Sequence, residues 1–92
     1  MMIPPGARVR LAPKARLQRD RVSGKWFLLY PERGLELSES ASRIVAACVE
    51  EKTLPVIVDE LTAASGEPRE RIETEVLSFL GALADRGLLV VT

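Results

Sequence analysis

The pattern of apolar and polar positions changes once along the chain, from short runs and alternation in the first part to a helical spacing after residue 38. The segment Lys25–Tyr30 holds a continuous apolar run, which predicts a strand buried on both faces. Pro31 ends this strand because proline has no N–H to donate to a sheet. Ala15–Asp20 and Gly34–Leu37 flank it and read as shorter strands. The short loops between them predict an antiparallel meander with Lys25–Tyr30 at its centre.

Three helices are predicted after this meander. The first begins at Ser38, the second near Thr53 and the third near Pro68, each with a residue suited to a helix start. Gly66 and Gly87 mark the ends of the second and third helices. The apolar stripes repeat with the period of a helix and consist of Ala41, Ile44, Val45 and Cys48; of Leu54, Ile57, Val58 and Leu61; and of Ile72, Val76, Phe79, Leu80 and Leu83.

The third helix, from about Pro68 to Arg86, carries an unusually wide apolar stripe. Leu77 and Ala84 extend the stripe on one flank, to an arc of about 160° at roughly 100° per residue. Packing on a single neighbour requires less than this. Two explanations stay open: the helix packs against both the sheet and the other helices, or part of the arc lines a groove.

The two ends of the chain are predicted to differ. Residues 1–14 are proline-rich without periodicity, so we expect a flexible N-terminal arm. Residues 15–92 are expected to form a single domain, because 92 residues leave no room for a second core. Leu88–Val91 is expected to be an extended tail packed back on this domain. The order of strands and then helices predicts an α+β, winged-helix-like fold, with a three-stranded antiparallel sheet followed by a three-helix layer.

Charge gives little general attraction to nucleic acid or to an anionic membrane, since 13 basic and 13 acidic side chains cancel. The stretch Arg8–Lys25 is locally basic and is either a solvated face or a surface for an acidic partner. No apolar run approaches the roughly 20 residues of a membrane span. The single Cys48 fits a reducing compartment, so we expect a cytoplasmic protein.

The residue inventory argues against catalysis. Histidine is absent, which removes His-based acid–base chemistry, a Cys–His nucleophile and any His/Cys zinc site. Cys48 lies on an apolar stripe and is predicted to be a small core residue rather than a reactive thiol. The six glycines are scattered and form no phosphate-binding loop. We therefore expect a protein that is not an enzyme and that holds no metal and no cofactor.

The predicted strand Gly34–Leu37 has a free edge, and we expect the protein to work there. If the third helix lies beside this strand, an extended peptide can pair with the strand and set apolar side chains against the helix. The leucines also have an ordinary interpretation as core residues, and the charged residues as solvated ones. The candidate contacts are Arg33, Gly34, Leu35, Glu36 and Leu37 on the strand side and Arg69, Ile72, Glu73, Val76, Leu77 and Leu80 on the helix side.

DNA binding is the competing function for a winged-helix-like domain. A recognition helix needs Arg, Lys, Asn or Gln near its N-terminus to reach base edges. The third helix offers Arg69 and Arg71 there, but the same turns carry four carboxylates, which would face phosphates unfavourably: Glu67, Glu70, Glu73 and Glu75.

Four segments follow one another in the chain: Trp26-Phe27-Leu28-Leu29-Tyr30-Pro31-Glu32; Leu37-Ser38 with Ser40-Ala41-Ser42-Arg43-Ile44-Val45; Thr53-Leu54 with Ile57-Val58-Asp59-Glu60-Leu61; and Phe79-Leu80-Gly81-Ala82-Leu83-Ala84-Asp85-Arg86-Gly87-Leu88-Leu89. In these segments and their order the chain resembles the PqqD family, the peptide chaperones of pyrroloquinoline quinone (PQQ) biosynthesis, over roughly residues 16–90. One departure concerns Val49-Glu50, which stand where the family commonly has Asp-Gly, so the turn after the first helix is built differently or that helix runs longer.

The resemblance implies a recognition domain for ribosomally made, modified peptides, in which a leader peptide adds as a strand beside the third strand and against the third helix. It implies the precursor peptide PqqA as ligand and presentation of that peptide to PqqE, a radical-SAM iron–sulfur enzyme. The signature Pro31-Glu32 favours this branch, with recognition in another modified-peptide pathway as the alternative. A free edge can also pair with a second copy, so a homodimer stays open.

Overall fold

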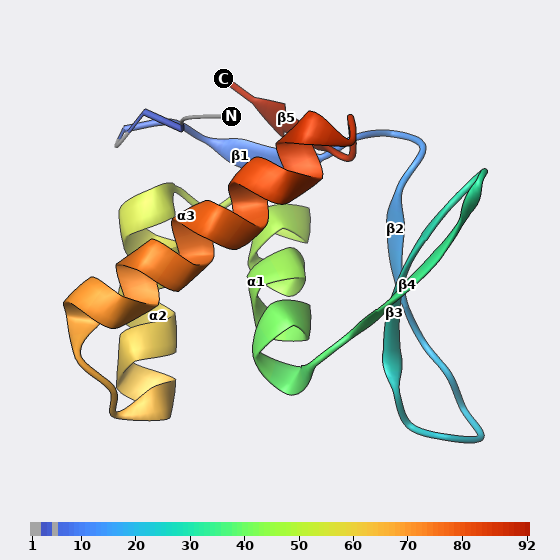
Figure 1. The fold of residues 1–92 in the computed structure, drawn as a ribbon, viewed down its shortest axis with the longest axis horizontal. Helices are drawn as coiled ribbons and strands as arrows, with labels where there is room; N and C mark the ends of the chain where they lie inside the picture. Colours follow the sequence, from blue (N-terminus) through green and yellow to red (C-terminus); the bar gives the residue numbers. More distant parts are fainter. Residues whose placement is uncertain (1–2, 5) are drawn as a thin grey trace.

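The computed structural model describes residues 3–4 and 6–92, which contain three α-helices and five strands (Figure 1). A three-stranded sheet lies at one end of the molecule, and a two-stranded sheet crosses the helices near the two chain termini. The α+β, winged-helix-like fold is therefore confirmed. The elements are β1 (Val9–Leu11), β2 (Arg16–Arg19), β3 (Trp26–Tyr30), β4 (Arg33–Leu37), α1 (Glu39–Val49), α2 (Leu54–Ser65), α3 (Arg69–Asp85) and β5 (Leu89–Val91).

The three-stranded sheet has the predicted meander order β2-β3-β4, with β3 in the centre. Gly24 supplies a left-handed backbone, with φ at 74°, to the turn between β2 and β3. The prediction that β3 is buried on both faces is wrong, because only Leu28 is fully buried there. The helices cover one face of the sheet, so Phe27 and Leu29 on the other face are only partly buried by their cross-strand neighbours.

The helix starts and stops follow the predicted chemistry. The Ser38 hydroxyl accepts a hydrogen bond from the Ala41 N–H at 3.1 Å and so caps α1. Thr53 occupies the N-cap of α2 without a side-chain hydrogen bond, and Gly66 ends that helix in the left-handed conformation. The predicted stripes are buried except for Ala41 and Phe79, which stay partly exposed.

Helix α1, rather than α3, forms the layer against the three-stranded sheet. It contacts β2, β3 and β4, whereas α3 packs mainly on α2 and β5. Figure 1 shows α1 between α3 and the sheet. The wide apolar arc of α3 is thus explained in part by α2 and β5. The expectation that α3 lies directly beside the third strand needs correction, because the N-terminal half of α1 intervenes.

The predicted flexible arm over residues 1–14 is wrong where the structure describes it, and residues 1, 2 and 5 lie outside the described residues. Val9–Leu11 forms β1, which pairs antiparallel with β5. Arg8 and Thr92 extend the pairing by exchanging two backbone hydrogen bonds of 3.0 Å. Val9 is fully buried, and Ile3 and Ala7 are also in the core. The extended C-terminal tail is confirmed as β5, and the N-terminal segment is its partner.

The turn after α1 places a non-glycine residue in a left-handed conformation. Glu51 has a φ of 56°, directly after the C-cap Glu50. This position costs a side-chain-bearing residue about 1 kcal/mol or more relative to glycine. It lies one residue beyond the Val49-Glu50 pair, at which the chain departs from the Asp-Gly pattern of the family it resembles.

We expect Glu51→Gly to raise the free energy of unfolding by about 0.5–1 kcal/mol, since relief of backbone strain is partly offset by the greater freedom of glycine in the unfolded chain. Glu51 is exposed, so no packing is lost. Urea denaturation measures the change. Glu50→Gly is the matched control, because Glu50 has a φ of −82° and gains nothing. If Glu50→Gly stabilised the protein as much as Glu51→Gly or more, the claim that the backbone is strained at Glu51 would be contradicted.

Candidate functional site: the edge of β4 and the α1–α3 groove

The outer edge of β4 offers unpaired backbone groups at two positions. The Asp20 N–H donates to the Lys25 carbonyl oxygen at 2.8 Å, so these residues form a hydrogen-bonded pair between β2 and β3. Antiparallel strands alternate such pairs with non-hydrogen-bonded ones. The backbone groups of Gly34 and Glu36 consequently point away from β3, and no partner for them lies among residues 3–4 and 6–92. The residues of β4 that bond to β3 are Arg33, Leu35 and Leu37.

The opposite edge of the sheet is less available to a further strand. On β2 the same alternation turns the backbone of Leu17 and Arg19 outward. The Arg19 carbonyl oxygen already accepts a hydrogen bond from the Gln18 side-chain amide at 3.2 Å. Exposed arginines at both ends of β2, Arg16 and Arg19, also discourage pairing. The sheet therefore favours strand addition at β4.

Gly34 lies within β4, opposite Leu29 of β3. A Cβ atom at this position would lie 2.9 Å from Cδ2 of Leu29, its cross-strand neighbour. That separation is shorter than real Cβ contacts, so any side chain here would displace Leu29. Because Cδ2 is the far end of a flexible side chain, a side chain at residue 34 would require Leu29 to change its conformation.

A groove of about 470 Å³ begins where β4 ends, at Ser38. We call it the α1–α3 groove, because the first turns of α1 form one wall and the N-terminal half of α3 forms the other, with the end of α2 between them. Its floor is buried, whereas Ala41 and Phe79 stay partly exposed within it. A strand added to β4 would leave the sheet at this groove. The apolar lining consists of Ala41, Ile44, Leu61, Ala64, Ile72, Val76 and Phe79.

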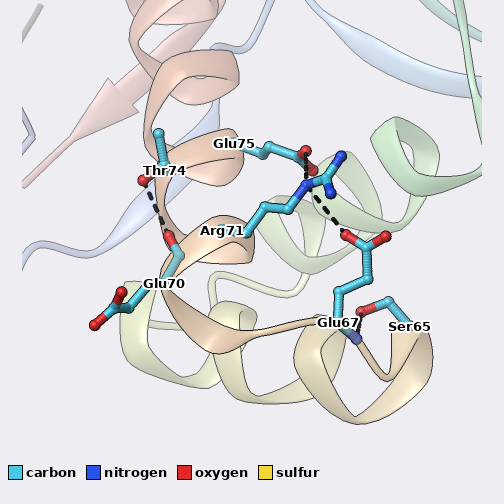
Figure 2. Close-up of polar contacts among 6 residues, drawn as sticks. All are labelled: Ser65, Glu67, Glu70, Arg71, Thr74 and Glu75. Carbon is cyan, nitrogen blue, oxygen red and sulfur yellow. Dashed lines mark hydrogen bonds and ion pairs between the residues drawn. The ribbon is translucent and has the colours of Figure 1, made fainter.

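Charged residues that line the α1–α3 groove are ion-paired, either with one another or with residues beside the groove. Figure 2 shows Arg71 between two carboxylates, with its Nε 3.4 Å from Oε2 of Glu67 and 3.4 Å from Oε1 of Glu75. On the other wall, Arg43 lies 3.3 Å from Glu39. All of these side chains are substantially exposed, so their net contribution to stability is small. The carboxylates beside the apolar interior therefore outnumber the guanidinium groups, because Arg71 is shared by two of them.

The loop before α3 is ordered by a local hydrogen bond, also drawn in Figure 2. In this loop the Glu67 N–H donates to the Ser65 hydroxyl oxygen at 3.2 Å. Within α3 itself, the Thr74 hydroxyl donates to the Glu70 carbonyl oxygen at 3.0 Å. The carboxylates of Glu67, Glu70 and Glu75 project from the same turns. These acidic turns oppose the approach of a phosphate backbone, as the sequence indicated.

The structure divides the predicted helix residues among three places. Ile72 and Val76 line the α1–α3 groove from its floor, and Leu80 is buried in the core. The other three candidates line a separate hollow of about 200 Å³, which the N-terminal Ile3 also lines. In that hollow Arg69 is ion-paired with Asp59. The residues that line this hollow rather than the groove are Arg69, Glu73 and Leu77.

Of the residues that line the groove, only Ile72 and Val76 were in the predicted set; the wall residues Ala41, Glu75 and Phe79 are among those that were absent from it. Glu75 and Phe79 lie one helical turn apart and share a face with Ile72, so the spacing of α3 could have identified them. The sequence did not reveal which flank of α3 is covered by the N-terminal segment. Without that contact, there was no reason in the sequence to choose one flank of α3 over the other as the wall of the groove.

Cys48, the single thiol of the chain, does not line the α1–α3 groove. Burial raises the pKa of the Cys48 thiol to about 12, so the thiol stays protonated and unreactive near neutral pH. Cys48 is fully buried, which confirms its interpretation as a core residue. No cluster of His, Cys, Asp or Glu in residues 3–4 and 6–92 is arranged to hold a metal ion. Within the same residues, no helix combines the length and hydrophobicity that a membrane crossing requires.

The fold matches two solved structures. The first is the solution structure of the PqqD truncation of Methylobacterium extorquens PqqCD, described as a functional and stand-alone recognition element for ribosomally synthesised and post-translationally modified peptides. It has a TM-score of 0.76 and 29% identity and covers 90% of this chain and 88% of its own. The second is TbiB1 in complex with the TbiA(beta) leader peptide, with a TM-score of 0.75, 26% identity and coverage of 87% and 93%. The fold is therefore that of the peptide-recognition elements.

Similarity in sequence shows to which family of peptide-recognition elements the chain belongs. The profile of the family described as coenzyme PQQ synthesis protein D (PqqD) matches residues 25–89. The PqqA binding protein of Bradyrhizobium diazoefficiens is 37% identical over 82% of this chain and 73% of its own length. That of Methylococcus capsulatus is 36% identical over 95% and 91%. The chain belongs to the PqqD family.

Proposed function

We propose that this protein binds the precursor peptide PqqA as an added strand along β4, with apolar side chains of the peptide in the α1–α3 groove. The observation that carries the proposal is the pair of outward-facing backbone positions, Gly34 and Glu36, directly before the groove. Backbone bonds at these positions would supply affinity without regard to sequence, and the groove would fix the register.

The names of the relatives support PqqA as the ligand, because the similar proteins of Bradyrhizobium and Methylococcus are both called PqqA binding proteins. A leader peptide of another pathway is the second candidate, and it is supported by the similarity to TbiB1 bound to its leader peptide. A neighbouring gene for a short peptide with a Glu-x-x-x-Tyr motif favours PqqA. A different precursor gene in that place favours the second candidate.

The proposed role is that of a carrier without chemistry of its own, which presents the bound peptide to the radical-SAM enzyme PqqE in the cytoplasm. Holding a flexible peptide raises its effective concentration at the enzyme. Part of the binding energy is spent on ordering the peptide, so moderate affinity is expected. A homodimer formed through β4 would occupy the same backbone groups, so peptide and second copy would compete.

Glu36→Pro is expected to weaken peptide binding about tenfold or more, because proline removes an outward-facing N–H and adds a ring on the edge where the peptide pairs. Proline is tolerated there because the lost N–H makes no bond to β3. Isothermal titration with the synthetic precursor peptide measures the change. Glu36→Gln is the matched control, since it removes the same charge, and the same 3.6 Å contact with Lys25, but keeps the N–H. Equal affinities for the two variants would rule out strand addition at Glu36.

A further inference from the structure

A second groove, of about 590 Å³, lies at the other end of α1. We call it the β2–α1 groove, because it is bounded by the connection from β1 to β2 and by the last turn of α1 with the residues that follow. Large apolar side chains line it without being fully covered. Val49 is 55% exposed, and Leu11 and Leu17 are only partly buried although they pack on the core. Such a concave, partly apolar surface is typical of a place where another molecule binds.

The charges on this groove favour an acidic partner. Arg10 and Arg16 line it, are exposed and have no carboxylate partner among residues 3–4 and 6–92. Of the two lining carboxylates, Glu50 is held by Lys52 at 3.2 Å. Glu51 alone remains as an opposing charge. Two free guanidinium groups beside exposed apolar side chains complement an apolar segment that carries carboxylates.

The two grooves can be occupied at the same time because they share no residue. The α1–α3 groove uses α1 residues up to Ile44, and the β2–α1 groove uses residues from Ala46 onward. The 11 residues of α1 span about 16 Å at 1.5 Å per residue. A partner at one end of this helix is thus held close to a peptide at the other end, as presentation of a bound peptide requires.

We propose that the β2–α1 groove is the docking surface for the enzyme that modifies the bound peptide, and that this enzyme inserts an apolar segment bearing carboxylates beside Arg10 and Arg16. The inference rests on the proposed function, because a carrier has to hold its peptide and its enzyme together. Beyond the proposed function, the inference names the surface that the enzyme contacts and the charge that the enzyme presents there. It also states that the peptide and the enzyme bind independently.

The test uses the full chain with Arg10→Glu and Arg16→Glu combined. The probes are the purified radical-SAM enzyme PqqE and, separately, the synthetic precursor peptide. Enzyme affinity is expected to fall about tenfold or more, because two attractive contacts become repulsive, while peptide affinity stays within about twofold of wild type. Arg21→Glu is the control, since Arg21 is exposed in the turn between β2 and β3 and lines neither groove. Val49→Asp provides a second variant that adds a carboxylate to the groove.

The two affinities separate the possible failures. Unchanged enzyme affinity in the double variant and in Val49→Asp would overturn the proposed docking surface and leave peptide binding by β4 intact. Loss of peptide affinity in the same variants, without loss in Glu36→Pro, would instead show that the peptide binds in the β2–α1 groove. That result would overturn both the peptide site on β4 and the enzyme site in this groove. Absence of enzyme binding by the wild-type protein, or disruption of a homodimer in place of an enzyme complex, would also overturn the inference. Circular dichroism verifies separately that the variants are folded, so that a loss of affinity reports on binding.

Discussion

Replacing Ala41 by arginine is expected to reduce binding of the precursor peptide about a hundredfold or more while the protein remains folded. Ala41 lies on the wall of the α1–α3 groove and is only partly buried, so a long side chain there extends into the groove. Its charged head would replace the apolar contacts that the peptide needs, in the manner of a lost hot spot. The helix itself tolerates the change, because arginine is a good helix former and the Ser38 cap bonds the backbone of residue 41.

Fluorescence anisotropy with a labelled precursor peptide measures this effect, with circular dichroism to verify the fold. Ala63→Arg is the matched control, because Ala63 is an exposed alanine on α2 that lines neither groove. It should bind as wild type does. Wild-type affinity in Ala41→Arg would show that the peptide does not enter the α1–α3 groove, whatever happens at β4.

The second large effect concerns stability. Val9→Asp is expected to lower the free energy of unfolding by about 3 kcal/mol or more, since it buries an unpaired carboxylate in the core. Val9 is fully buried in β1, where it pairs with Val91 of β5. Domains of this size are stable by only about 5–15 kcal/mol, so the loss is a large part of the total.

Guanidinium denaturation followed by tryptophan fluorescence measures the loss, with the single Trp26 as the probe. Arg10→Asp is the control on the neighbouring position of the same strand, where the side chain is exposed and the change should stay within about 0.5 kcal/mol. Similar stability of the two variants would mean that β1 is a detachable arm, as the composition of residues 1–14 suggested.

The three-stranded sheet and the helix boundaries were predictable because local chemistry determines them. Pro31 stops β3 and Ser38 caps α1, and both effects act within a few residues of the chain. The buried stripe of α2 follows directly from its 3.6-residue spacing. The free edge of β4 was also predictable, since the last strand of a meander has only one neighbour.

The pairing of β1 with β5 was not predictable from local pattern. Each strand has only three residues, and the partners lie at opposite ends of the chain. Proline-rich composition near the N-terminus indicated an arm, whereas burial of Val9 and the two bonds between Arg8 and Thr92 fix it in place. This tertiary contact also explains the misplaced helix candidates. Ile3 is buried and lines the hollow beside Leu77, whereas the residues of α3 that line the groove lie on the other flank.

Amide hydrogen exchange, with and without the precursor peptide, tests strand addition at β4 most directly. The Gly34 and Glu36 amides point to solvent and should exchange rapidly in the free protein, whereas Leu35 and Leu37 are already bonded to β3. We predict that the peptide protects Gly34 and Glu36 and leaves Leu17 and Arg19, on the edge of β2, unchanged. Protection of the β2 amides, or none at Gly34 and Glu36 under saturating peptide, would contradict the account.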